Sequence, residues 1–196
     1  MTSFDGQLVS VPPAMNHAYA PLNVTGKYRC RCEDFIVVEQ SLSPTHVGEH
    51  DHLLIEKRGC NTEWVARRLA DYAGVPPVAV GYAGRKDRHG VTTQAFTVRP
   101  SAAAQVDWSH FETSGFAIKA LTKTQKKLRP GDHHGNRFDL VLREVTGDLS
   151  ARLEKIASEG FPNYFGPQRF GRGGMNLMAV GSLFEGRRVP RRERSF

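Results

Sequence analysis

Asp87 stands between two cations, Lys86 and Arg88, in the glycine-rich stretch 81–94. Flanking cations favour the ionised form of a carboxylate, and an ionised aspartate at a loop tip suits a nucleophile or a general base. The same cations can hold a phosphate backbone beside it. On these residues alone, a surface turn with solvated charges is the more common explanation.

The elements on either side of this stretch determine where Asp87 lies. The short apolar run 78–82 and the β-branched run 92–98 predict two strands joined by a polar, glycine-bounded turn. We therefore expect a hairpin-like unit with Lys86 and Asp87 at its tip.

Two further strands are predicted upstream of this hairpin. Residues 34–40 and 52–57 are rich in β-branched and apolar side chains, and we expect them to pair antiparallel. Strand alternation places Phe35, Val37 and Glu39 on one face of the first strand.

A helix is predicted between the second strand and the hairpin. Val65, Leu69 and Tyr72 recur at the spacing of one helical face. The residues at 61–62, Asn and Thr, can cap its start, and Gly74 ends it.

The region after the hairpin has the same mixed character. Alternating residues predict strands at 116–122 and 137–145, and Asp148 begins a helix that ends at Gly160. Strands and helices without regular alternation indicate an α+β fold with a mostly antiparallel, mixed sheet and flanking helices. Aromatic, arginine and glycine residues dominate after residue 160, where we expect a boundary.

Composition and charge exclude several classes of protein. The 196 residues are 39% hydrophobic and 24% charged, which excludes a wholly disordered chain, a collagen and a coiled coil. No apolar run reaches the roughly 20 residues of a membrane span, and the N-terminus does not resemble a secretory signal. Three scattered cysteines do not form a disulfide framework, so we expect a cytoplasmic protein.

The net charge of +7 is concentrated in two segments. Residues 119–137 carry six Lys or Arg and one Asp, and residues 187–196 carry five Arg and one Glu, which leaves a net charge of −2 on the rest. Such concentration favours a polyanionic partner, most often a nucleic acid, although a solvated face and a basic tail explain it equally well.

Four sequence blocks together resemble the signature of the tRNA pseudouridine synthase D (TruD) family, and they occur in its order. They are the family's strand Phe-x-Val-x-Glu, its Gly-x-Lys-Asp run with Thr-x-Gln, its Gly-Asn-x-Phe motif and its Asn-Tyr-Phe-Gly…Gln-Arg-Phe-Gly block. The matching residues here are 35–39, 84–94, 135–138 and 163–171. The resemblance extends from about residue 34 to residue 181.

The resemblance implies a pseudouridine-synthase-like catalytic domain that isomerises a uridine of tRNA, at position 13, to pseudouridine. Asp87 matches the family's catalytic aspartate, and neither a cofactor nor a metal is implied. Phe35 and Phe138 match positions around the base, where an aromatic face can stack on uracil, although both also suit an ordinary core. Asn136 can read a uracil edge, or adopt a left-handed turn.

The remaining expected contacts are polar. Lys86 and Gln94 are candidates to support the catalytic residue or to bind a phosphate. The basic segment supplies candidate tRNA backbone contacts, namely Lys123, Lys126, Lys127 and Arg129. Asp132 departs from the family pattern and adds a negative charge there. The alternative function is a non-catalytic RNA-binding module that uses the same loop, 119–137.

Two other clusters are weaker candidates for chemistry. His46, His50 and His52 lie near two carboxylates, yet no matching pair of ligands at zinc-like spacing occurs elsewhere. Cys30-x-Cys32 with Cys60 lacks a fourth ligand. We expect no bound metal and no membrane association.

The length is short for the family. By the resemblance, residues 1–160 are the first part of the catalytic domain, and residues 161–196 begin an inserted TRUD domain that is cut short. We therefore expect a truncated, cleaved or two-piece enzyme that is poorly active alone. Its expected partners are tRNA and the missing C-terminal part, and the complete enzyme is expected to be a monomer.

Overall fold

The computed structural model describes residues 18–19, 23–101, 105–111, 113–163, 170 and 175–186. The chain divides into two compact units, and Thr25–Thr146 form one of them. The segments before and after these residues form the other. No helix among the described residues is long and apolar enough to cross a membrane.

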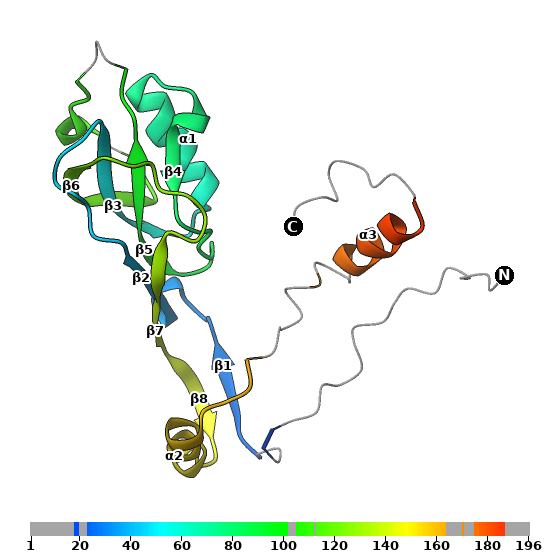
Figure 1. The fold of residues 1–196 in the computed structure, drawn as a ribbon. Helices are drawn as coiled ribbons and strands as arrows, with labels where there is room; N and C mark the ends of the chain where they lie inside the picture. The colour runs from blue at the N-terminus through cyan, green and yellow to red at the C-terminus, as the bar shows by residue number, and fades with distance from the viewer. Residues whose placement is uncertain are drawn as a thin grey trace. The chain divides into compact units, whose positions relative to one another are not determined.

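The larger unit contains a six-stranded sheet (Figure 1). The strand order is β6-β3-β5-β2-β7, and β4 pairs with β5 beyond this path. The strand bounds are β2 Phe35–Ser41, β3 His50–Arg58, β4 Val80–Tyr82, β5 Val91–Val98, β6 Phe116–Thr124 and β7 His133–Leu140. A separate two-stranded sheet pairs β1, Thr25–Tyr28, with β8, Leu142–Thr146. The mixed α+β architecture predicted from the sequence is confirmed.

Two strand predictions were wrong in detail. β2 and β3 do not pair with each other, because β5 lies between them, antiparallel to β3 and parallel to β2. The predicted single strand 137–145 is two strands in different sheets. They separate at Val141, whose N–H donates to the carbonyl of Asp34 at 2.9 Å, one position beyond the last β2–β7 pair; from Leu142 on, the chain pairs with β1.

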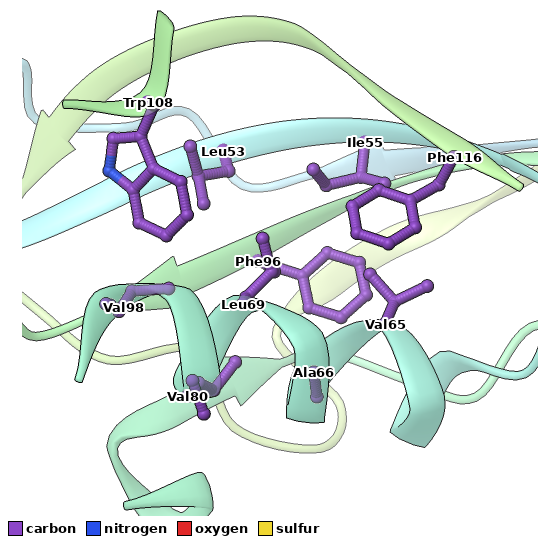
Figure 2. Close-up of a cluster of buried hydrophobic side chains, with 12 residues drawn as sticks. Leu53, Ile55, Val65, Ala66, Leu69, Val80, Phe96, Val98, Trp108 and Phe116 are labelled. Atoms are coloured by element: carbon purple, nitrogen blue, oxygen red, sulfur yellow. The ribbon is translucent and has the colours of Figure 1, made fainter. Parts of the chain in front are cut away.

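Helix α1, Thr62–Ala73, packs on one face of this sheet (Figures 1 and 2). Val65 and Leu69 are fully buried, whereas Tyr72 remains 39% exposed, so the predicted apolar stripe is narrower than its spacing indicates. Gly74 ends the helix with φ of 63°, a left-handed conformation in which glycine carries no Cβ penalty. The residues buried between helix and strands include Leu53, Ile55, Phe96, Val98, Trp108 and Phe116.

The same face of the sheet changes character toward the ends of β3 and β5. The register places Leu53 opposite Phe96, Ile55 opposite Gln94 and Lys57 opposite Thr92. Because directly paired residues point to the same face, the apolar core is continued by buried polar side chains. We call Lys57, Thr92, Gln94 and Glu39 the polar row; each is at most 5% exposed.

The smaller unit contains two described helices, α2 Ser150–Glu159 and α3 Met175–Phe184. Gly160 follows the last turn of α2, as predicted. The helix begins later than predicted: its N-cap is Leu149, and Asp148, one residue before it, accepts a hydrogen bond from the Ser150 N–H at 2.8 Å. The basic segment 187–196 and most of the predicted block 163–171 lie outside the described residues.

Candidate active site

Asp87 lies on the loop 84–90 that joins β4 to β5, and its side chain is 34% exposed. Buried side chains support the loop from below. The Gln94 amide donates to the Gly84 carbonyl at 3.0 Å. The Thr62 hydroxyl accepts a hydrogen bond from the backbone N–H of Lys86 and donates one to the side-chain oxygen of Gln94, both at 2.9 Å. Predicted site residue Gln94 is therefore completely buried beneath the loop.

A second support comes from Lys57 at the end of β3. Its ammonium group donates to the carbonyls of Cys60 and Asp87 at 2.7 Å each, and to that of Lys86 at 3.4 Å. The side chain is fully buried, and this burial lowers the pKa of Lys57. The ammonium group thus ties the turn after β3 to the backbone of the catalytic candidate.

Lys86 points inward rather than toward solvent. Its ammonium group lies 2.5 Å from Glu39 Oε2, and the two side chains are 6% and 0% exposed. The other carboxylate oxygen of Glu39 accepts from the Ser41 hydroxyl and from the Ala95 N–H, at 2.9 and 3.3 Å. This buried ion pair fixes the residue next to Asp87, because a buried charge requires a partner.

Arg29, which follows β1, contacts Asp87 from the other side. Its guanidinium lies 3.5 Å from Asp87 Oδ2 and 3.6 Å from the centre of the Phe35 ring. Arg29 has φ of 56°, a conformation that costs a non-glycine residue about 1–3 kcal/mol and that clusters at functional sites. The planar cation therefore joins the carboxylate to an aromatic face.

Phe35 and Phe138 lie together beside Asp87's loop. Their ring centres are 6.1 Å apart; Phe35 is 4% exposed and Phe138 is 54% exposed. Gly90 permits the loop to approach, because a Cβ there would lie 2.6 Å from the Phe35 carbonyl oxygen. Phe138 therefore offers an accessible ring next to one that is mostly covered.

Asn136 lies on β7, directly opposite Glu39 of β2. The same pairing places Phe138 opposite Val37, so both β7 residues point to the face that holds the polar row. The side-chain oxygen of Asn136 is buried and has no hydrogen-bond partner among the described residues. A buried amide oxygen without a partner is uncommon in proteins, so this position is a candidate for a contact with a ligand.

The predicted backbone-binding cations differ in their present contacts. Lys123 pairs with Asp51 at 2.5 Å, and Lys127 donates to the Val78 carbonyl. Lys126 and Arg129 are exposed. Lys127 and Arg129 border a hollow of about 580 Å³ beside α1, which Arg67 also lines.

The histidine and cysteine clusters have structural contacts. Burial lowers the pKa of both His50 and His52, which favours neutral rings. The Cys60 thiol donates to the Gly115 carbonyl, and burial raises its pKa. Among the described residues, no group of three His, Cys, Asp or Glu side chains is arranged to hold a metal ion.

Three residues of this site were missed by sequence reasoning. Arg29 and Thr62 carry no distinctive local pattern, since their roles depend on contacts across 58 and 24 positions of the chain. Lys57 had a usable signal: it continues the buried alternation of Leu53 and Ile55, where a lysine requires an internal partner.

Comparison with known proteins gives consistent matches. The family model for tRNA pseudouridine synthase D (TruD) matches residues 17–187. Proteins of that name from Methylococcus capsulatus and Nitrosococcus oceani are 46% and 47% identical over 91% and 87% of this chain, which covers 52% and 49% of theirs. A solved structure described as the TruD protein of Methanosarcina mazei has a TM-score of 0.66 and 28% identity, over 82% of this chain and 39% of that one.

The chain thus spans about half the length of the curated relatives it matches. The match includes the loop that carries Asp87, the strand that carries Phe35 and the strand that carries Asn136 and Phe138. On these grounds, the chain belongs to the tRNA pseudouridine synthase D family.

Proposed function

We propose that this chain carries the catalytic aspartate of a tRNA pseudouridine synthase, an isomerase that converts uridine 13 of tRNA to pseudouridine. The observation that carries the proposal is the contact set of Asp87. A partly exposed carboxylate lies 3.5 Å from Arg29, and the same guanidinium covers Phe35 at 3.6 Å. A reactive group, a counter-charge and an aromatic surface are thus adjacent.

The reaction exchanges one glycosidic bond for another. The C1′–N1 bond breaks, the base turns, and C1′ bonds to C5; the C5 hydrogen leaves as a proton, and N1 gains one. The Asp87 carboxylate can attack C1′, attack the base, or accept the C2′ proton. Each route uses the carboxylate of Asp87, and the guanidinium of Arg29 lies 3.5 Å from it.

The rings and amide beside Asp87 are suited to hold an extruded uracil. Extrusion costs a few kcal/mol, which stacking on an aromatic ring offsets. We propose Phe138 as the exposed platform, with Phe35 packed behind it. Asn136, whose side-chain oxygen has no partner among the described residues, reads the uracil edge. Lys86 and Gln94 act from beneath, as supports of the loop.

We propose that the basic segment binds tRNA phosphates. Lys126 and Arg129 are exposed, whereas Lys123 and Lys127 must exchange their present partners, Asp51 and the Val78 carbonyl. Binding through such contacts weakens steeply with salt.

The proposal extends to the organisation of the enzyme. Residues 1–160 supply the first part of the catalytic domain, and residues 161–196 begin the inserted domain. A chain or segment equivalent to the second half of the relatives completes the enzyme, which is a cytoplasmic monomer without metal or cofactor. The support for the second half is that the chain covers about half of each relative.

Release of tritium from tRNA labelled at C5 of uridine tests the proposal, because C5 loses its hydrogen when it bonds to C1′. The wild-type chain, alone or with the second half of the Methylococcus capsulatus relative, is expected to release tritium. Asp87→Asn should reduce the rate at least about a hundredfold while leaving tRNA affinity unchanged.

Two outcomes contradict the proposal in different ways. Full release by Asp87→Asn overturns the catalytic assignment. Salt-sensitive tRNA binding without tritium release, both by the chain alone and by the chain with the added second half, instead identifies the chain as an RNA-binding module.

A further inference from the structure

The turn between β3 and α1 is joined to the loop 84–90 by a set of polar contacts. Arg88 donates to the Gly59 carbonyl at 3.2 Å, and the Gly59 N–H donates to the Gly90 carbonyl at 3.3 Å. Thr62 adds the contact to the Lys86 N–H. Lys57 lies at the centre of this set, and it is the buried cation that binds both segments.

The contacts of Lys57 match the capacity of its ammonium group. An ammonium has three N–H donors and no acceptor, and here three backbone carbonyls receive them. Burying a lysine without such partners is costly, so the carbonyls cannot move far without leaving a charge unsatisfied. One of these carbonyls belongs to Asp87 itself, at 2.7 Å.

The geometry points to Lys57 as the positioning residue of the proposed active site: it fixes the backbone of Asp87 from inside the protein and so sets where the carboxylate lies. Arg29 contacts the carboxylate of Asp87 from one side, and Lys57 donates a hydrogen bond to the main-chain carbonyl of Asp87 from beneath. The role deepens the proposed function, because a displacement of the reactive group by about 1 Å costs on the order of a hundredfold in rate.

Hydrogen exchange of the full chain, followed by mass spectrometry, tests the positioning without any need for activity. In Lys57→Met, amides of the loop 84–90 are expected to exchange at least about tenfold faster, which corresponds to about 1.4 kcal/mol of local opening. Amides in the middle of α1 should keep their wild-type rates. Lys155→Met, the same change at an exposed helix residue, should alter neither region.

The tritium assay then separates positioning from binding. Lys57→Met should lower kcat about a hundredfold with KM within about twofold of the wild type. Lys57→Arg, which keeps the charge and the donors, should recover part of kcat. If the wild type releases no tritium, the proposed function fails, while the exchange data still decide whether Lys57 fixes the loop.

Three results would overturn the inference. The first is unchanged exchange in the loop 84–90 of Lys57→Met. The second is equal acceleration in the loop and in α1, which would show a general loss of stability. The third concerns folding. If Lys57→Met does not fold, Lys57→Gln, which retains two N–H donors, replaces it in the test. Failure of both variants to fold would show that Lys57 is needed for the whole fold and not specifically for the position of the loop.

Discussion

The two halves of one face of the six-stranded sheet have opposite chemical character. Beneath α1 the face is apolar, and Leu53, Ile55 and Phe96 are fully buried against the helix. Beneath the loop 84–90 the same two strands and the neighbouring β2 contribute the polar row, which is buried as deeply. One half gains stability from removing apolar area from water. The other buries polar groups that need partners; Lys57, Gln94 and Glu39 have them, whereas the Thr92 hydroxyl has none among the described residues.

The difference shows how a rigid scaffold holds a reactive loop. An apolar floor would contact the loop 84–90 without directing it, because dispersion and the hydrophobic effect are not directional. Lys57, Thr62, Gln94 and Glu39 instead bind named atoms of that loop or of its side chain Lys86. Substitutions in the first half should therefore change stability, and those in the second should also change the geometry around Asp87.

The largest loss of stability is expected in the apolar half. Phe96→Ala removes a fully buried ring, so the free energy of unfolding should fall by about 3–5 kcal/mol. Urea denaturation measures this loss. Phe96→Leu, which keeps most of the volume, is the matched control, and an equal loss in both variants would contradict the cavity explanation.

A loss of about 3 kcal/mol is expected when Glu39→Gln leaves the Lys86 ammonium buried without its counter-charge. The variant should also lose tritium release, because Lys86 precedes Asp87. The double variant Glu39→Gln with Lys86→Met should recover stability but not the rate. Additive stability losses would show that the two residues are not coupled.

A smaller loss, about 1–3 kcal/mol, is expected for Thr62→Val. The change leaves the Lys86 N–H and the buried Gln94 oxygen without a partner while preserving side-chain shape. Hydrogen exchange should rise in the loop 84–90 more than in the apolar half. Thr113→Val, at a residue on the surface, should have no such effect.

The smallest expected effect is a pH dependence on the opposite face of the sheet. Burial lowers the pKa of His50 and His52 below 6.5, the value expected in the unfolded chain. The unfolded state therefore takes up protons first, so stability is complete above pH 6.5 and is lost as the pH falls through the folded-state pKa values. The thermal midpoint should decline between pH 7.5 and 5.5, and less so in His52→Gln.

Much of the fold followed from local patterns. Alternation correctly gave the face shared by Phe35, Val37 and Glu39, and the helical stripe located α1. The pairing of strands was predicted less well, since alternation does not say which strand is the neighbour. Inserting β5 between β2 and β3 depends on long-range contacts that no local pattern encodes.

The candidate site shows the same limit. Asp87, Phe35, Asn136 and Phe138 were located by the family resemblance, and each now has a defined place. Arg29 and Lys57 were not located in this way, because their roles depend on contacts with residues that are distant in sequence. Buried polar side chains in an apolar pattern are the signal that could have identified Lys57.

The pairing of β7 with β2 also sets an order of events during synthesis. Val37 and Phe138 are about a hundred positions apart, and contacts of such separation form late, after a large loss of chain entropy. The hairpin that carries Asp87 is complete well before β7 leaves the ribosome. A nascent chain stalled before residue 133 would therefore present its aspartate without the aromatic platform or the amide that accompany it in the folded protein.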